Sequence, residues 1–430
     1  MTTPPPPRPR SRPGPVSRGA RSLARFRSRL DVERLRGALN RPLPVPPEGL
    51  RRGPLREGAF RSPLRGTAMT ARVGLFLGLA FGTCFLTGLY SHLLQHQPTW
   101  LPLPNRPTWL YQLTQGVHVA TGLVAIPLLL VKLWTVYPKL FAWPPARDLL
   151  HALERGSLLL LVAGAVFELV TGLSNIALWY PWHFFFTDAH YATAWIVGGA
   201  LLIHIAAKLT LIRTGLRTPL REEPAEPAPA GAGGGLSRRQ LLATTGAAAG
   251  VITVATVGQT VGALHRVSVL GPRDPAVGPQ GLPVNKSAAG AGVTDRARDP
   301  DYRLSLLGPH PVTLTLADLN AMPQHSSRLP IACVEGWSAT KTWSGVRLRD
   351  LLDLAGFPHD AWLVVESLQH GGRYRAAEIG PPHSRDPLTL LALRVDGEVL
   401  HVDHGYPARL IAPARPGVLQ TKWVGKVRPR

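Results

Sequence analysis

The chain has 430 residues, of which 45% are apolar, only 17% are charged, 43 are Gly and 43 are Pro. This composition excludes one compact soluble domain and favours several apolar segments joined by flexible linkers. Two cysteines exclude a disulfide scaffold. The net charge of +22 would indicate nucleic-acid binding if it were spread over a folded surface, but residues 1–70 alone carry 16 Arg, no Lys and four acidic residues. That segment is rich in Pro and has only two aromatic residues, so we predict a disordered, basic, cytoplasmic tail and no nucleic-acid partner.

Four apolar stretches follow the tail, at 73–94, 113–137, 156–178 and 190–212. Each is long enough for a helix that crosses a bilayer, which takes about 20 residues. Basic residues precede the first stretch, separate the second from the third and follow the fourth, whereas the other two loops are rich in tryptophan. The positive-inside rule therefore predicts an all-α membrane domain over 71–213, with a cytoplasmic N-terminus.

A Pro/Ala/Gly linker over 214–236 leads to SRRQLLATTGAAAGVITVATVGQTVGAL, at 237–264. Paired arginines before a weakly apolar stretch resemble a twin-arginine export signal, placed here inside the chain. As a fifth span this segment crosses outward, which predicts that residues 265–430 lie outside the membrane of a bacterium. The resemblance also implies that this external domain is exported already folded, often with a cofactor inserted. Whether the segment is cleaved stays open.

The membrane stretches contain an internal repeat. HVATGLVAIPLLLVKL, from His118, aligns with HYATAWIVGGALLIHI, from His190, and FLTGLYS at 85–91 aligns with LVTGLSN at 169–175. The repeat places the two histidines at matching depths near the outer face, and two facing imidazoles are what a six-coordinate haem b requires. The alternative is two interfacial histidines that are bonded to backbone or water. Ionisable side chains at membrane depth are usually functional, which favours haem ligation.

His204 follows His190 by 14 residues, about 21 Å along a helix and on roughly the same face. This spacing resembles that of membrane b-type cytochromes with two stacked haems, and makes His204 a candidate ligand of a second haem. The residue that matches it in the second stretch is Lys132, so His151 would have to complete the pair. His92 and His96, at the end of the first stretch, are alternative outer ligands or part of a quinone site.

Residues 265–430 alternate short β-like runs with Pro/Gly turns, which predicts an α+β domain. The sequence shows no dinucleotide fingerprint, P-loop or zinc spacing. We predict one amphipathic helix over 344–356, ending at Gly356, and six strands, at 302–308, 312–316, 361–368, 373–379, 397–402 and 408–413.

Cys333, in IACVEGW, is the single cysteine of this external domain. From its residue type alone it could be a buried small side chain, a nucleophile or a metal ligand. Its surroundings are more specific. CVEGWSATKTWSGVRLRDLL, DPLTLLALRVDGEVLHVDHGYPARLIAP and QTKWVGKV occur in order, after LPVNKSAAGAGVTDRARDPDYRLSLLG. Together they resemble the sulfite oxidase-type molybdopterin domain over roughly residues 280–428.

The resemblance implies that Cys333 is the thiolate ligand of molybdenum, a soft metal ligand, and the catalytic cysteine. It also implies molybdopterin contacts from eight polar residues: Asn285, Lys286, Ser367, His404, Arg409, Gln420, Thr421 and Lys422. His370, Arg373 and Tyr374, in HGGRYR, are candidates for contacts with an anionic or sulfoxide substrate. Trp337 and Trp343 are expected to belong to the core.

The sequence thus predicts a multi-domain oxidoreductase that transfers an oxygen atom at molybdenum and exchanges electrons with the quinone pool through haem b. One hypothesis is a quinol-linked reductase of S- or N-oxides such as methionine sulfoxide, because bacterial relatives of this kind work with a haem membrane subunit. The second is a sulfite-type dehydrogenase that feeds electrons to quinone, and the third is a non-catalytic module on a membrane cytochrome. The substrate, the direction of electron flow, the number of haems, the quinone and the oligomeric state stay open.

Overall fold

The computed structural model describes residues 37, 41, 62–140, 148–223, 236–271 and 273–430. The chain divides into two compact units, and the larger one comprises residues 60–138 and 160–430. Most of the predicted basic tail and most of the linker lie outside the described residues, so their predicted disorder stays a prediction.

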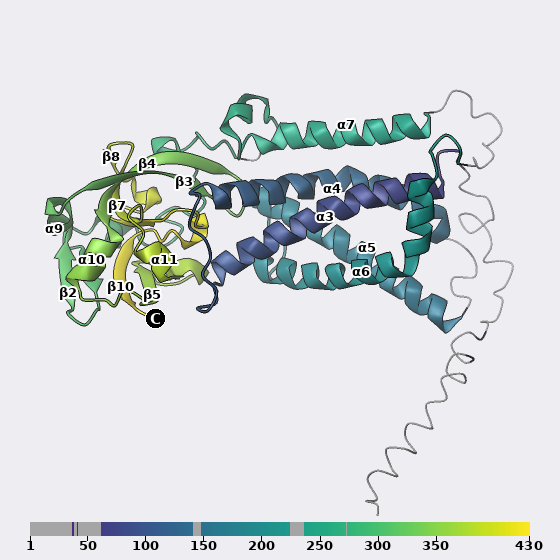
Figure 1. Cartoon of the computed structure of the whole chain (residues 1–430). Helices are drawn as coiled ribbons and strands as arrows, with labels where there is room; N and C mark the ends of the chain where they lie inside the picture. The colour runs from purple at the N-terminus through teal and green to yellow at the C-terminus, as the bar shows by residue number, and fades with distance from the viewer. Residues whose placement is uncertain (1–36, 38–40, 42–61, 141–147, 224–235, 272) are drawn as a thin grey trace, which may run out of the picture. The chain divides into compact units, whose positions relative to one another are not determined.

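Five long helices occupy the first half of the described chain (Figure 1): α3 Thr67–Gln95, α4 Leu110–Leu140, α5 Leu149–Ile176, α6 Phe186–Arg217 and α7 Arg238–Val257. All five are long and apolar enough to cross a membrane, judged by length and composition. The first four contain the four predicted stretches, except that α5 ends two residues before the stretch 156–178 does.

The N-termini of α3 and α7 show which residues stabilise the start of each helix. The carboxylate of Glu223 accepts hydrogen bonds from the amides of Ala68 and Met69, at 2.6 and 3.3 Å, and so satisfies free N–H groups in the first turn of α3. Helix α7 begins with a capping box, in which Ser237 and Gln240 each bond the backbone amide of the other. The SRRQ motif therefore contains the start of a helix.

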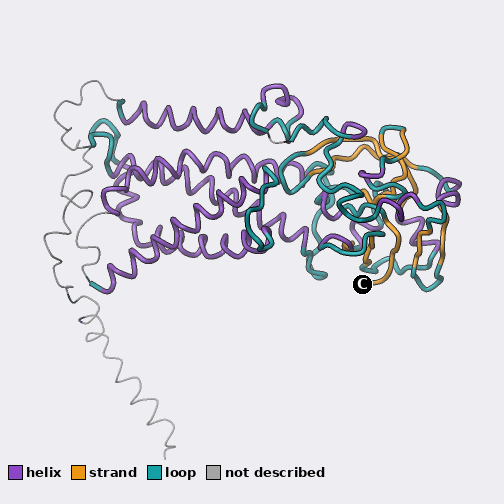
Figure 2. The backbone as a smooth tube through the Cα atoms, turned by 180° about the vertical axis from the view of Figure 1, so that it is seen from behind, coloured by secondary structure: helices purple, strands orange, loops and turns teal. Residues whose placement is uncertain are grey.

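The second half of the chain forms two five-stranded sheets, which Figure 2 shows in orange. In the first, the order is β2-β1-β10-β5-β6, and only β1 and β10 pair in parallel. Its strands are β1 Arg303–Leu306, β2 Val312–Thr315, β5 Leu363–Ser367, β6 Ala376–Ile379 and β10 Val424–Pro429.

The second sheet has the order β3-β4-β7-β8, with β9 also paired to β7, and all of its pairings are antiparallel. Its strands are β3 His325–Ala332, β4 Ser338–Arg347, β7 Leu390–Val395, β8 Glu398–Val399 and β9 Arg409–Ile411. Three short helical segments precede the first strand: the 3-10 turns η3 Gly262–Val267 and η4 Pro279–Gly281, and α8 Thr294–Arg298. Others connect the strands: α9 Leu316–Ala321, α10 Leu348–Leu354, α11 Pro381–Ser384, and the 3-10 turns η5 Arg373–Arg375, η6 Val402–His404 and η7 Gly417–Leu419.

All six predicted strands overlap observed ones, but the predicted helix over 344–356 is wrong at its start. Residues 344–347 belong to β4, where they pair with β7, and the helix begins only at Leu348. Four strands were not predicted, namely β3, β4, β7 and β10. Pro330 interrupts the pattern of β3, which is tolerated because β3 lies at an edge of its sheet. The Leu/Ala-rich β7 reads equally well as a helix, because short apolar runs carry no decisive period.

Two apolar cores stabilise this domain. One packs α10 against the first sheet, with Leu304, Leu351 and Leu363 fully buried. The other packs beside the second sheet and includes Cys333, Trp337 and Trp343, each no more than 4% exposed. An apolar helical region followed by a mixed α and β domain confirms the predicted order of fold classes.

Candidate functional site

The loop that carries Cys333 is a tight connection between β3 and β4. The amide of Cys333 donates to the carbonyl of Trp337 at 2.9 Å, and the amide of Gly336 donates to the carbonyl of Cys333 at 3.1 Å. Gly336 has φ +96°, and a Cβ there would lie 2.9 Å from Val119 of α4. A glycine is needed at this position for both reasons. The loop therefore fixes the thiol at the end of β3, against α4.

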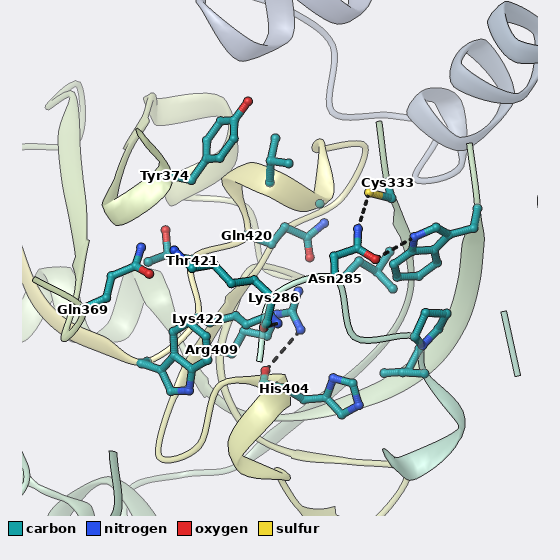
Figure 3. Close-up of a pocket in the computed structure, with 17 residues that line it drawn as sticks. Asn285, Lys286, Cys333, Gln369, Tyr374, His404, Arg409, Gln420, Thr421 and Lys422 are labelled. Atoms are coloured by element: carbon teal, nitrogen blue, oxygen red, sulfur yellow. Dashed lines mark hydrogen bonds between the residues drawn. The ribbon is translucent and has the colours of Figure 1, made fainter. Parts of the chain in front are cut away.

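Asn285 joins the thiol to its neighbours. Its amide Nδ2 donates to Cys333 Sγ and to Glu335 Oε1, each at 2.9 Å, while its Oδ1 accepts from the indole of Trp337 at 3.2 Å. Figure 3 shows Asn285 beside the thiol of Cys333, with a dashed line that marks their hydrogen bond. Burial raises the pKa of Cys333 to about 12, and Glu335 adds to the effect. Burial likewise raises the pKa of Glu335 to about 7. Binding of a metal at Sγ must therefore displace a proton.

Cationic side chains line the same pocket as Cys333. Arg409 is only 4% exposed, and burial lowers its pKa to about 10, so its guanidinium stays charged at neutral pH. Lys422 donates from Nζ to the carbonyls of Lys286 and Asp403, at 2.9 and 2.7 Å. Burial, and then the charge of Arg409, lower the pKa of Lys422 to about 7. Arg409, Lys422 and Lys286 all line the pocket, and no Asp or Glu is among the described residues that line it, so the pocket favours an anionic ligand.

Several buried polar atoms of the pocket-lining side chains have no hydrogen-bond partner among the described residues: Arg409 Nε, Gln420 Oε1, Thr421 Oγ1 and Gln369 Oε1. Buried polar groups are normally bonded, and leaving one unsatisfied costs about 1–3 kcal/mol. Donors and acceptors are both represented among these atoms. A ligand with a phosphate and a polar ring system would satisfy them, and so the donor set fits molybdopterin.

The structure brings most of the predicted pocket residues together. Nine of them line the pocket: Asn285, Lys286, Cys333, Tyr374, His404, Arg409, Gln420, Thr421 and Lys422. They come from loops and strand ends that are far apart in the sequence (Figure 3). His404 donates from Nε2 to the carbonyl of Pro279 at 2.7 Å, and burial lowers its pKa to about 4, so it is neutral there.

The structure does not bring Ser367, His370 and Arg373 to the pocket wall. The hydroxyl of Ser367 accepts from the amide of Gln369 at 3.3 Å, and the exposed His370 lies 3.4 Å from Arg296. Arg373 forms a bidentate pair with Asp188 of α6, at 2.7 and 2.8 Å. The substrate and pterin roles predicted for these three residues have no support from this placement.

Gln369 and Trp337 are two of the pocket-lining residues that sequence reasoning missed. Gln369 is buried and lines the pocket directly after β5, where a polar residue at the end of an apolar strand was the available signal. Trp337 was predicted as core, and it is buried, but its ring also lines the pocket and its indole N–H orients Asn285. An amphipathic ring can serve both purposes.

The two histidines of the membrane repeat lie face to edge, with ring centroids 6.3 Å apart. His118 Nδ1 donates to the carbonyl of Cys84 at 2.8 Å, and His190 Nδ1 lies 3.0 Å from the carboxylate of Glu168. Because both acceptors fix the proton on Nδ1, the lone pair of each ring lies on Nε2, the nitrogen available for a metal.

The Thr-Gly pair of the repeat explains how the rings are oriented. Thr87 Oγ1 lies 3.3 Å from His118 Nδ1, and Thr171 Oγ1 lies 3.1 Å from His190 Nδ1. The adjacent glycines face the same rings, since a Cβ at Gly88 would lie 2.8 Å from His118 Cε1 and one at Gly172 would lie 3.8 Å from His190 Cε1. Each unit of the repeat thus combines a threonine that bonds the imidazole with a glycine beside the ring, and at Gly88 the ring leaves no space for a Cβ.

The other candidate ligands differ in their surroundings. His92 stacks on Tyr191 with ring centroids 3.6 Å apart, and its ring lies 4.6 Å from that of His96. His204 lies partly buried on α6. Lys132, its counterpart in the repeat, donates to the carbonyl of Thr70 at 2.9 Å. A second haem and a quinone site at these residues stay predictions.

Comparison with known proteins bears on the C-terminal part of the chain. The family model described as "oxidoreductase molybdopterin binding domain" matches residues 291–429. Mitochondrial sulfite oxidase of Rattus norvegicus is 30% identical over 159 residues, covering 30% of this chain and 29% of the rat protein.

Two bacterial proteins are similar over shorter stretches. The uncharacterized oxidoreductase YuiH of Bacillus subtilis (strain 168) is 31% identical over 116 residues, covering 27% of this chain and 57% of that protein. The putative protein-methionine-sulfoxide reductase subunit YedZ1 of Azospira oryzae is 34% identical over 110 residues, covering 26% of this chain and 41% of that protein. The chain spans less than two thirds of the length of each of these three relatives.

The matched residues contain both sheets, the Cys333 loop, and the pocket residues Arg409 and Lys422. The C-terminal region of this chain is therefore an oxidoreductase molybdopterin-binding domain of the sulfite oxidase family.

Proposed function

We propose that the chain is a membrane-bound molybdopterin oxidoreductase of a bacterium that exchanges electrons with the quinone pool through haem b. The observation that carries this proposal is the pocket, in which Cys333 Sγ shares a buried wall with Arg409, Lys422 and polar atoms that have no partner among the described residues. The five apolar helices support the location, with the helices in the cell membrane and the C-terminal domain on its outer face.

Each pocket residue would have its own task. Arg409 and Lys422 would hold the phosphate of the pterin, and Gln420, Thr421, Asn285 and Lys286 would bond its polar atoms, with His404 as a neutral partner. When bound, molybdenum supplies oxygen-atom transfer to or from a small oxo compound. Asn285 would keep Cys333 Sγ oriented and partly charged through its N–H donor, as hydrogen bonds to a charged group stabilise that form.

His118 and His190 would bind the haem through Nε2, oriented by Thr87, Thr171 and the carboxylate of Glu168. The close pair of His118 and His190 supports one haem, and His204 would bind a second. The haem would transfer single electrons between quinone and the pocket.

The preferred direction is reduction, in which a quinol and an S- or N-oxide give a quinone, the reduced compound and water. The similarity to a protein named as a putative methionine-sulfoxide reductase subunit favours this direction. A sulfite-type dehydrogenase that runs the reverse reaction is the second candidate, favoured by the similarity to sulfite oxidases.

An anaerobic substrate screen that reads the haem spectrum separates the two. We expect methionine sulfoxide to reoxidise the reduced haem and sulfite to leave the oxidised haem unchanged. The opposite pair of results would establish the dehydrogenase. Purified protein without molybdenum would contradict both and identify a non-catalytic module. A Cys333→Ser variant with full molybdenum content and turnover would overturn the ligand assignment.

A further inference from the structure

The carbonyl of Val334, the residue next to Cys333, accepts hydrogen bonds from two membrane helices. Gln115 of α4 donates from Nε2 at 2.8 Å, and Asn175 of α5 donates from Nδ2 at 3.4 Å. Gln115 lies three residues before His118, and Asn175 lies four residues after Thr171, which bonds His190. Both donors are therefore about one helical turn from the residues that hold the histidine pair.

The amide of Gln115 is held in one orientation. Its Oε1 accepts from the hydroxyl of Tyr111 at 3.5 Å, and that hydroxyl also lies 3.2 Å from Ser91 Oγ. Tyr111 is 1% exposed and Gln115 5% exposed, so water does not compete for these bonds. This leaves Nε2 of Gln115 directed at the Cys333 loop.

A second glutamine of α4 contacts the same domain without touching this loop peptide. Gln112 Nε2 donates to Ser338 Oγ at 2.8 Å and to the carbonyl of Thr260 at 3.3 Å. Gln112 and Gln115 thus lie three residues apart on one helix. Of these two glutamines, Gln115 alone bonds Val334, the residue that follows Cys333.

We propose that Gln115 is the positioning residue that couples the Cys333 loop to the helix of His118, and that electrons cross between the two cofactor sites over this contact. Asn175, on α5 in the other unit of the repeat, donates a second hydrogen bond to the same carbonyl of Val334. The inference rests on the proposed function.

The electron count follows from that function. In the proposed reduction, quinol gives up two electrons and two protons. The electrons would pass one at a time from a haem held by His118 and His190 to the pocket, and the oxide would take up two electrons and two protons to give the reduced compound and water. Because electron transfer falls steeply with distance and with loss of bonded contacts, the Gln115–Val334 bond controls the crossing rate and leaves the chemistry of each site unchanged.

The test uses the full chain with its native cofactors. In Gln115→Met, which is close in volume but has no donor, we expect reoxidation of reduced haem by methionine sulfoxide in stopped flow to slow by about tenfold or more, since small misplacements cost rates of this order. Turnover with reduced viologen, which delivers electrons to the pocket directly, and the haem spectrum and potential should stay at wild-type values. Hydrogen exchange across residues 331–339 of the resting protein should become faster.

Gln112→Met is the matched control, and we expect it to keep the wild-type reoxidation rate. Equal slowing in both variants would overturn the proposal, because it would show that α4 acts only by docking the domain. An unchanged rate in Gln115→Met would also overturn it, while leaving the proposed function intact. Wild-type protein without a haem band would contradict the proposed function itself, and the inference with it.

Discussion

Burial keeps the Cys333 thiol neutral, although Arg409 and Lys422 line the same pocket. Burial raises its pKa to about 12, whereas the same burial lowers the pKa of Lys422 to about 7. The thiol and the ammonium are therefore both shifted toward their uncharged forms. A metal bound at Sγ and an anion bound at Lys422 would reverse both shifts, so cofactor binding and protonation are linked.

Asn285→Leu removes the donor to Cys333 Sγ and the acceptor of the Trp337 indole. We expect the molybdenum content of purified protein to fall, with an apparent loss of affinity of about 10- to 100-fold, the range typical of partners that orient a metal ligand. Metal analysis by mass spectrometry is the measurement. Asn320→Leu, at an exposed asparagine of α9, is the control and should keep its molybdenum. Equal metal content in the two variants would contradict the role of Asn285.

Cofactor loading should depend on pH through Lys422. Lys422 has a pKa of about 7, which an anionic phosphate beside it must raise, so phosphate binding takes up a proton. This contribution to affinity is greatest below about pH 7 and falls as the pH rises above it, whereas metal binding releases the proton of Cys333 and acts in the opposite direction. Lys422→Arg stays protonated over this range and keeps only the Cys333 contribution. We therefore expect the ratio of molybdenum retained by reconstituted wild-type protein to that retained by Lys422→Arg to decrease between pH 7 and pH 9; a constant ratio would exclude Lys422 as a titrating group.

At the scale of elements, the sequence repeat corresponds to two similar surroundings for His118 and His190. The alignment of FLTGLYS with LVTGLSN places Thr87 and Thr171, and Gly88 and Gly172, in matching positions on α3 and α5. Each Thr-Gly pair contacts the histidine of the following helix. Each copy of the repeated sequence therefore supplies a threonine and a glycine beside one imidazole ring.

Gly88→Ala places a methyl group 2.8 Å from Cε1 of His118, closer than side-chain contacts allow, so the ring must move. We expect the reduced haem absorption band to weaken or shift and the haem potential to change. Gly78→Ala, on the same helix α3, meets nothing within 4 Å and should leave the spectrum unchanged. A wild-type spectrum for Gly88→Ala would show that His118 does not bind the haem.

The β3–β4 hairpin shows which elements the sequence predicts poorly. The pattern of β3 contains Pro330 and few β-branched residues, and β4 was read in part as a helix because SGVRLRDLLDLAG has helical spacing. Residues 343–347 are nonetheless a strand, because they pair with β7. Tertiary pairing of this kind overrides local propensity.

At the scale of the whole molecule, two acidic residues join the helices and their connections to the C-terminal domain. Asp386 is buried and accepts from Asn105 at 2.7 Å and from Arg106 at 2.8 Å, both in the α3–α4 connection. Asp188, on α6, forms its bidentate pair with Arg373 near the surface.

We expect Asp386→Ala to weaken the attachment of the domain more than Asp188→Ala does. Loss of the buried carboxylate removes an acceptor that Asn105, Arg106 and the amide of Leu388 share, whereas exposed ion pairs contribute about 0–1 kcal/mol. Limited proteolysis of the purified protein, followed as the rate of release of the C-terminal domain, measures the difference. Equal release rates would show that Asp386 does not hold the domain.

The sequence by itself determined the five apolar helices, the histidine repeat and the family of the C-terminal domain, because long apolar runs, repeats and ordered motifs are local properties of a chain. It also identified Cys333, Arg409 and Lys422 before their contacts were known. Only the tertiary structure decided that Ser367, His370 and Arg373 lie away from the pocket wall, that Gln369 and Trp337 line it, and that Gln115 bonds the Cys333 loop. Those facts depend on which segments, separated by as many as 219 residues, pack together, and no local pattern encodes that.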